Sequence, residues 1–221
     1  MPQIFTASAD TWLRAAAVGV AVASIGGVLY GAGLVNSTYV TRAGAPVDQP
    51  VPFSHKHHVG ELGLDCRYCH TSVESSANAG FPPTSTCMTC HSQVWTGAPM
   101  LAEVRASLAD DKPLVWNRVS QVPDYVFFNH SIHVNRGVPC VACHGRIDRM
   151  AMMTRAQPFQ MRFCLDCHRD PAPRLRPPDQ ITRMDWTSWE NDPRNRGYGL
   201  ARMRELQVHV NQLTNCGICH R

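Results

Sequence analysis

Ten cysteines carry most of the chemical information in this 221-residue sequence. They fall into five copies of one pentapeptide, Cys-x-x-Cys-His, and no cysteine lies outside these copies. The cysteine pairs are Cys66 and Cys69, Cys87 and Cys90, Cys140 and Cys143, Cys164 and Cys167, and Cys216 and Cys219. The histidines that follow them are His70, His91, His144, His168 and His220.

This spacing is the attachment signature of c-type haem. Two thiols three residues apart on a helical turn can form thioethers with the two vinyl groups of one porphyrin. The next residue then lies under the ring, where its imidazole can bind iron. Structural zinc sites use such units in pairs, and five units do not pair off evenly. Disulfide frameworks do not repeat one local spacing throughout, so we expect five covalently bound haem c groups.

Four of the six remaining histidines lie in a repeated pattern, Phe-x-His-x-x-His, which precedes the first and the third haem motif. Histidines three apart share a helical face but can reach different rings. A low-spin electron-transfer haem needs a second axial ligand, which four such histidines would supply. We predict that His55 and His130 serve the haem that follows directly, and that His58 and His133 serve another. His57 is not expected to be a ligand.

An internal repeat follows from this arrangement. Each copy contains the double-histidine element, a haem motif close behind it, and a second haem motif further on, over residues 53–91 and 128–168. The fifth motif, in residues 200–221, lacks a double-histidine element. Its sixth ligand is left between two candidates: His209, seven residues before the motif, and Met150, whose thioether would favour reduced iron. Met161 and Met184 are less favoured candidates.

Composition bounds the architecture of the chain. The formal charge of +4 is small and evenly spread, which argues against nucleic acid as a partner. Residues 46–221 provide about 35 residues per expected haem, too few to surround each porphyrin with a conventional core. We therefore predict a multihaem cytochrome c domain of short helices and irregular loops packed around haem, with almost no sheet. Helices are expected at 100–110 and 200–213, and irregular chain at 170–196, where Trp186 and Trp189 would pack on a haem.

The N-terminal part reads as a membrane anchor. Residues 15–35 contain no charged side chain, and about 20 apolar residues suffice to cross a bilayer. We predict a cytoplasmic segment at 1–14, a transmembrane helix at 15–38 and an exported domain at 46–221; a cleaved signal peptide is the rival interpretation. Because c-type haem is attached outside the cytoplasmic membrane, the haem domain is expected on the periplasmic side of a single-pass protein.

The full order of motifs resembles the pentahaem membrane-anchored subunit of alternative complex III, a bacterial quinol-oxidising complex unrelated to cytochrome bc1. The matching segments cover nearly the whole chain: residues 52–58, 65–70, 123–130, 133–137, 143–150, 163–169 and 216–221. The double-histidine elements alone are also similar to small cytochromes of the c7 type.

The resemblance implies an electron-carrying subunit with no catalytic residues of its own. Its partners would be integral quinol-oxidising subunits and an iron–sulfur subunit. Its acceptor would be a monohaem cytochrome c, a blue-copper protein or a terminal oxidase. The resemblance also favours Met150 over His209 as the remaining ligand. The alternative function is an autonomous, single-anchor multihaem quinol dehydrogenase, and a catalytic reductase with an open axial site is a further rival.

Overall fold

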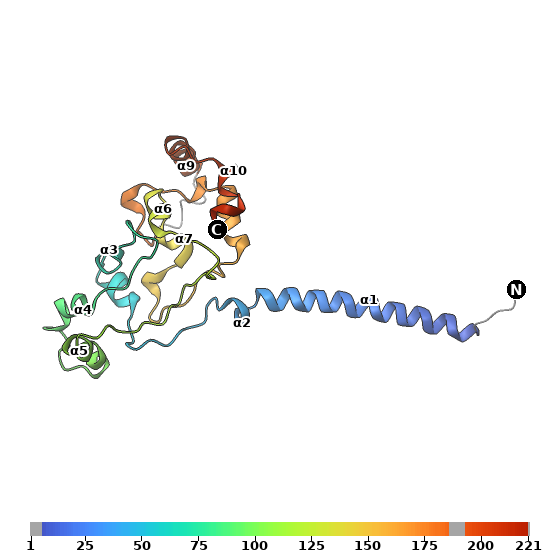
Figure 1. Ribbon diagram of the computed structural model, residues 1–221, viewed down its shortest axis with the longest axis horizontal. Coiled ribbons are helices and arrows are strands. Elements are labelled where there is room, and N and C mark those ends of the chain that lie inside the picture. Colours follow the sequence, from blue (N-terminus) through green and yellow to red (C-terminus); the bar gives the residue numbers. More distant parts are fainter. Residues whose placement is uncertain (1–5, 186–192, 221) are drawn as a thin grey trace. The chain divides into compact units, whose positions relative to one another are not determined.

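The computed structural model describes residues 6–185 and 193–220, and it divides into two units, residues 1–42 and 43–221. Trp186 and Trp189, for which a haem contact was predicted, lie outside the described residues. Both units are drawn in Figure 1. The helices and helical turns are α1 (Ala7–Asn36), α2 (Thr38–Thr41), η1 (Lys56–Glu61), α3 (Cys66–Cys69), α4 (Thr84–His91), η2 (Pro99–Leu101), α5 (Ala102–Ala109), α6 (His130–Asn135), α7 (Cys140–His144), η3 (Ile147–Arg149), α8 (Met161–Arg169), η4 (Ala172–Arg174), η5 (Pro178–Gln180), α9 (Pro193–Glu205), α10 (Val210–Leu213) and η7 (Cys216–Ile218).

The first unit is dominated by helix α1, which is long and apolar enough to cross a membrane. A stretch of 18 residues within Ser8–Thr41 has a mean hydropathy of 1.9, and the 30 residues of α1 span about 45 Å, more than the hydrocarbon thickness of a bilayer. The helix begins at Ala7, before the predicted start of the span. An ion pair between Asp10 and Arg14 lies in this added part. Ser37, in an extended conformation, separates α1 from the short helix α2.

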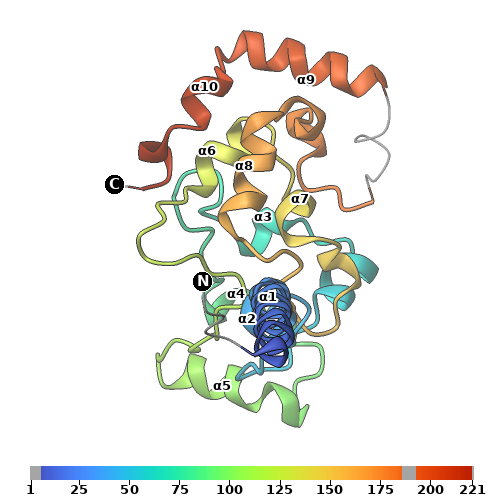
Figure 2. The ribbon, with the colours of Figure 1, turned by 90° about the vertical axis from the view of Figure 1, so that its right-hand side faces the viewer.

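The second unit confirms the predicted fold class, because it is built from short helices and loops. Among the described residues, the only pairings of extended chain are two isolated bridges, Ala43 with Arg155 and Pro46 with Thr154. Figure 2 shows α4 and α5 at one end of this unit and α9 and α10 at the other, with α3, α7 and α8 between them. The elements that carry the haem motifs therefore follow one another along the unit.

Protein side chains bury little of this unit's interior. Eight hydrophobic residues of the described chain are buried, and no large side chain is fully buried. The one cluster of buried residues joins Val51 to Leu101 and Val104, where α5 packs beside α4. A domain of this length normally closes around a core of its own. The small core agrees with the prediction that bound haem supplies much of the packing.

Two helix predictions have different outcomes. The helix expected at 100–110 is present as η2 and α5, with Pro99 at the first position as expected. The single helix expected at 200–213 is wrong, because it is divided into α9 and α10. Gln207 adopts a left-handed conformation (φ 52°), and the Val208 amide closes the end of α9 by donating to the Met203 carbonyl. The stretch expected to be irregular contains the turns η4 and η5 and the start of α9.

Candidate haem sites

Each Cys-x-x-Cys-His motif lies on a helix or a helical turn, and in the first, third and fifth motifs the first cysteine is also the first residue of that element. Asp65 caps α3 by accepting a hydrogen bond from the Arg67 amide at 2.9 Å, and Asn215 caps η7 through the Gly217 amide at 2.9 Å. Pro139 precedes α7, and its fixed φ suits the start of a helix. The helical turn brings the two cysteines of each motif to one side, as attachment to one porphyrin requires.

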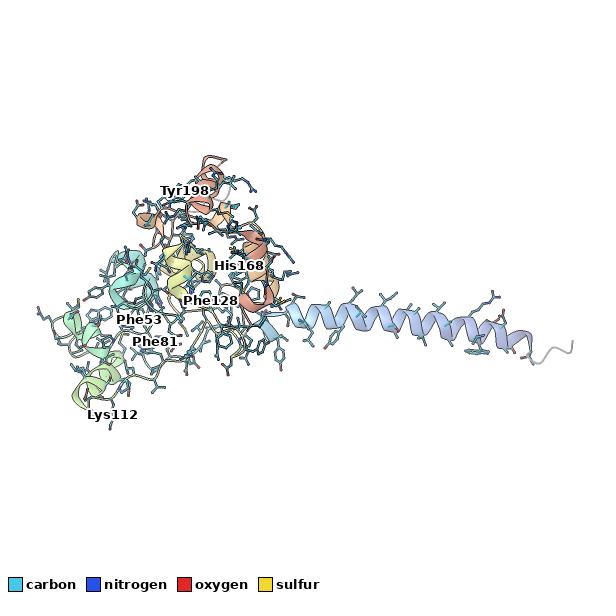
Figure 3. All side chains as sticks on the ribbon, turned by 45° about the horizontal axis from the view of Figure 1, so that its top comes forward. Phe53, Phe81, Lys112, Phe128, His168 and Tyr198 are labelled. Carbon is cyan, nitrogen blue, oxygen red and sulfur yellow. The ribbon has the colours of Figure 1, made fainter. Side chains whose placement is uncertain are left out.

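The two double-histidine elements have the same three-dimensional geometry. Phe53 meets His55 edge-on, with ring centroids 4.9 Å apart, and stacks on His58 at 4.4 Å. Phe128 meets His130 edge-on at 4.8 Å and stacks on His133 at 4.5 Å. The two phenylalanines are labelled in Figure 3. Each phenylalanine therefore fixes two imidazoles at roughly a right angle to one another, so the two histidines of one element face different sites.

Three of the four predicted distal histidines face a motif histidine across a gap of constant width. The ring centroids are 6.1 Å apart for His58 and His91, 6.3 Å for His130 and His144, and 6.2 Å for His133 and His168. Two imidazoles that share one metal ion lie about 6 Å apart, because each metal–nitrogen bond is about 2 Å long and each ring adds roughly half its width. The separation in all three pairs therefore fits two axial ligands on one iron.

The fourth predicted distal histidine, His55, lies beside the first motif. Burial, and then the nearby imidazole of His70, lower the pKa of His55 to about 4. Its Nδ1 atom is buried and has no hydrogen-bond partner within the described chain. Burial, followed by His130, lowers the pKa of His144 to about 4 as well. Both rings are therefore neutral at pH 7, which is the state that binds a metal.

The backbone fixes the orientation of most of these rings through Nδ1. A carbonyl oxygen lies 2.7–3.2 Å from the Nδ1 atom of seven histidines, with the partners Ser54 for His58, Gly80 for His70, Val94 for His91, Ala77 for His130, Asn129 for His133, Leu213 for His168 and Tyr125 for His220. A ring that donates from Nδ1 presents a bare Nε2 lone pair on its other side. This arrangement is typical of histidines that bind metals.

His57 takes no part in these pairs, as the sequence predicted. Its Nδ1 atom lies 3.0 Å from the Glu61 carboxylate, and its ring stacks on Trp95 with centroids 6.0 Å apart. The side chain is largely exposed.

The two candidates for the tenth axial ligand lie in different places. Met150 packs beside the first double-histidine element, where its carbonyl accepts a hydrogen bond from the Lys56 amide at 2.9 Å, and its sulfur lies 3.9 Å from the Thr154 hydroxyl. His209 is exposed and lines a hollow of about 510 Å³ together with Met203 and other residues at the end of α9.

The ten cysteines are thiols set in partly apolar surroundings. Eight are half-buried, whereas Cys90 and Cys216 are exposed. Burial raises the pKa of the Cys143 thiol to about 11, and burial is also the main cause of the raised pKa of Cys69. The Cys143 and Cys69 thiols therefore remain protonated at neutral pH, unlike the low-pKa thiol of a reactive cysteine. Their place beside the imidazole pairs fits attachment of a prosthetic group rather than redox catalysis by sulfur.

Comparison with known proteins gives the same class of protein. The family model described as cytochrome c7 and related cytochrome c matches residues 126–221. The multihaem cytochrome c subunit of menaquinone reductase from Nitratidesulfovibrio vulgaris (strain Hildenborough) is 32% identical over 186 residues, which cover 79% of this chain and 77% of that protein.

Proposed function

We propose that this chain, which belongs to the family of multihaem cytochromes c, carries electrons within a membrane-bound, quinone-linked oxidoreductase complex. The observation that carries the proposal is the set of imidazole pairs at 6.1–6.3 Å, each joining a Cys-x-x-Cys-His motif to a histidine of a double-histidine element. Closed axial positions on both faces suit electron transfer, whereas a catalytic haem keeps one position open.

The cysteines would attach the haem groups, and the histidines would bind their irons. The ten cysteines would hold five haem groups covalently, and each group would supply an iron that gains or loses one electron. The five motif histidines would bind the iron from one face. His55, His58, His130 and His133 would bind four of the irons from the other, and Met150 and His209 are the candidates from the sequence for the fifth.

We further propose that electrons pass outward, from integral quinol-oxidising and iron–sulfur subunits to a periplasmic acceptor. The acceptor would be a monohaem cytochrome c, a blue-copper protein or a terminal oxidase. The order of motifs along the chain resembles that of a subunit of a quinol-oxidising complex, and this resemblance supports the outward direction of electron flow. In this scheme the chain is the carrier, and the partner subunits oxidise the quinol. Helix α1 would hold the chain in the cytoplasmic membrane, with the haem domain on the outer side.

A second candidate has the opposite direction of electron flow. The relative from Nitratidesulfovibrio vulgaris bears the name of a menaquinone reductase subunit, and this name favours delivery of electrons towards menaquinone. The autonomous quinol dehydrogenase is the third candidate, and it requires no other subunit.

Stopped-flow reduction distinguishes the three candidates. The full chain would be purified in detergent, both alone and with its co-purifying subunits. A reduced menaquinone analogue would be mixed with the oxidised protein, and a reduced monohaem cytochrome c with a second sample. We expect quinol to reduce the complex and not the isolated chain. Reduction of the isolated chain by quinol would favour the autonomous dehydrogenase. Rapid reduction by the cytochrome, passing on to menaquinone, would favour the second candidate. Failure of both donors to reduce the complex would contradict the proposed function.

A further inference from the structure

The contacts between cysteines of different motifs define neighbours among the five sites. The Cys66 thiol of the first site and the Cys140 thiol of the third are each the main cause of the shifted pKa of the other, which places the two thiols side by side. Cys69 of the first site lies near Cys87 of the second. Cys143 of the third site lies near both cysteines of the fourth. Cys164 of the fourth site lies near Cys219 of the fifth.

Hydrogen bonds between segments support two of these relations independently, namely the first with the second site and the fourth with the fifth. The Tyr68 hydroxyl, within the first motif, bonds the Thr89 hydroxyl within the second at 3.1 Å. His168 of the fourth motif lies 3.0 Å, through Nδ1, from the Leu213 carbonyl, just before the fifth motif. The rings of His55, His70 and His144 lie close enough to influence one another's charge, which joins the first site to the third.

The junction between the first and third sites has the character of a two-fold axis. Cys66 and Cys140 are equivalent residues of the two sequence repeats, and their thiols lie close enough to shift each other's pKa. The Ser131 amide, after the first histidine of one element, donates to the Ser76 carbonyl six residues after His70. The Lys56 amide, equivalent to Ser131, donates to the Met150 carbonyl six residues after His144. Contacts that recur in both directions between equivalent positions are the mark of an isologous, two-fold interface.

From these contacts we infer that the sites form a single unbranched line in the order second, first, third, fourth, fifth, and that electrons enter and leave only at the second and fifth sites. This inference rests on the proposed electron-carrying function and specifies its route. The two terminal sites are also the ones with an exposed cysteine, Cys90 in the second and Cys216 in the fifth. The ends of the line coincide with the two ends of the unit in Figure 2, where α4 and α10 lie.

The order can be tested on the intact protein by locating the five irons in an experimental structure of the holoprotein. We expect the irons to follow one another in the order second, first, third, fourth, fifth. An iron of the second or fifth motif in the interior of the line, or a branched arrangement, would overturn the inference.

A haem deletion tests the route itself. In the double variant Cys140→Ala/Cys143→Ala, loss of the central site should leave two haems on each side of the gap. A donor that reduces all five haems of the wild type should then rapidly reduce only two of the four remaining haems, whether its electrons enter at the second or at the fifth site. In the matched variant Cys87→Ala/Cys90→Ala, a donor that uses the fifth site should still reduce all four. Rapid reduction of all four haems in the central variant would contradict the linear route. Failure of the wild type to accept electrons would instead contradict the proposed function.

A different observation bears on the missing tenth ligand. Four helix ends in the described chain close in the same way, with a residue in the left-handed conformation after the last turn: Gly63, Asp111, Gly137 and Gln207. The amide of the residue after each of these donates back to a carbonyl in the helix. The residues that supply the carbonyl are His58, Ser107, His133 and Met203. Met203 therefore occupies, on α9, the position that the second histidine occupies in each double-histidine element.

The surroundings of Met203 suit an axial ligand. Its half-buried side chain lines the hollow of about 510 Å³ at the end of α9. The chain leads from this hollow through α10 to Cys216. Two other methionines considered from the sequence fit less well, because Met161 is 68% exposed and Met184 is buried in the protein core. Met150 lies beside the first element, where a distal histidine is already present.

We propose that the Met203 thioether is the sixth ligand of the fifth haem. Potentiometry and electron paramagnetic resonance of the purified holoprotein test this assignment. In Met203→Leu, we expect one haem to lose its low-spin signal while five haems remain attached. Met203→His should restore the low-spin signal with a lower potential for that haem, because a thioether raises the potential relative to imidazole.

Met150→Leu and His209→Gln are the matched controls and should leave every signal unchanged. An unaltered spectrum in Met203→Leu would contradict the assignment. The same would hold if Met150→Leu or His209→Gln, rather than Met203→Leu, removed the signal.

Discussion

Individual histidines in this protein are held from both sides, by an aromatic ring and by a backbone carbonyl. His133 stacks on Phe128, and its Nδ1 atom lies 2.7 Å from the Asn129 carbonyl four residues earlier. Burial is the main cause of the lowered pKa of His133. The ring is therefore neutral at pH 7, and its Nε2 atom is available to bind a metal. A ring fixed in this way needs little reorganisation when it binds a metal.

Removal of one predicted distal ligand should change one iron and leave attachment intact. In His130→Ala, we expect one haem to become high-spin, because its sixth position opens, while all five thioether-linked haems are retained. Electron paramagnetic resonance measures the spin state, and the mass of the denatured chain measures attachment. His57→Ala is the control, since His57 pairs with Glu61 and should leave the spectrum unchanged. A fully low-spin spectrum for His130→Ala would refute its role.

Asp65 should make stability depend on pH at the acid end. The pKa of Asp65 is lowered from 3.8 to about 2, mainly by the Arg67 guanidinium and further by the Arg67 amide and the Thr182 hydroxyl. Because the folded pKa is the lower one, the stabilisation is present above pH 4 or so and is lost as the pH falls towards 2. Asp65→Ala should cost about 1 kcal/mol at pH 7, a value usual for a helix cap. The carboxylate is partly exposed, so its ion pair adds little. Denaturant titrations of the holoprotein from pH 2 to 7 should show the difference shrinking with acid; a constant difference would contradict this origin.

Residue types were the most predictable level of this protein. The Cys-x-x-Cys-His spacing is local, and a single helical turn is enough to explain it. The repeated Phe-x-His-x-x-His pattern predicted which histidines face the sites, although their role as ligands remains a prediction. The carbonyl partners were not predictable, because some join distant segments: Ala77, beside His130, lies 53 residues away in sequence.

At the level of elements, the ends of short helices set the geometry. Gly137 closes α6 with φ at 98°, and a Cβ atom there would lie 2.7 Å from the Arg176 carbonyl oxygen. Gly63 closes η1 with φ at 70°, but the space around it is open. A comparison of these two equivalent glycines therefore separates the energetic cost of the left-handed conformation from the cost of a clash with Arg176.

Alanine at these two positions should have unequal effects. Gly63→Ala should lower the free energy of unfolding by roughly 1–2 kcal/mol, the cost of a left-handed residue with a Cβ atom. Gly137→Ala should cost more, because the Arg176 backbone must also move. Denaturant unfolding of both variants, compared with the wild type, measures the difference. Equal losses would show that the contact with Arg176 is not restrictive.

Helix predictions held where a local signal marked the boundary. Pro99 marked the start of the helix near residue 100, and a proline at the first position is a known start signal. The division of α9 from α10 was missed, because Gln207 rather than glycine takes the left-handed conformation there. Glutamine gives no such signal in a sequence. This boundary is also the one that brings Met203 into correspondence with the double-histidine elements.

For the whole molecule, the two units should be separable. Residues 43–221 contain all the motifs and the small hydrophobic core, whereas the exposed apolar side chains of α1 suit lipid. A chain of residues 43–221, exported behind a cleavable leader, should be soluble without detergent and should keep five haems. Size-exclusion chromatography and the haem content of the soluble fraction measure this. Aggregation, or haem content below that of the full chain, would show that the N-terminal unit is required for the fold.

The spatial order of the sites was beyond sequence reasoning. The order of motifs along the chain does not give their order in space, whereas the interaction between the Cys66 and Cys140 thiols places the first and third sites side by side. Such contacts depend on how the two repeats face each other, and a repeat pattern does not specify that relation.

The mass of the denatured polypeptide tests the central claim most directly. Protein produced with the machinery for cytochrome c maturation would be unfolded, freed of all non-covalent groups and weighed intact. We expect the mass of the chain plus five haems, in a single species. A chain without added mass, or with ten modified thiols and no porphyrin, would contradict it.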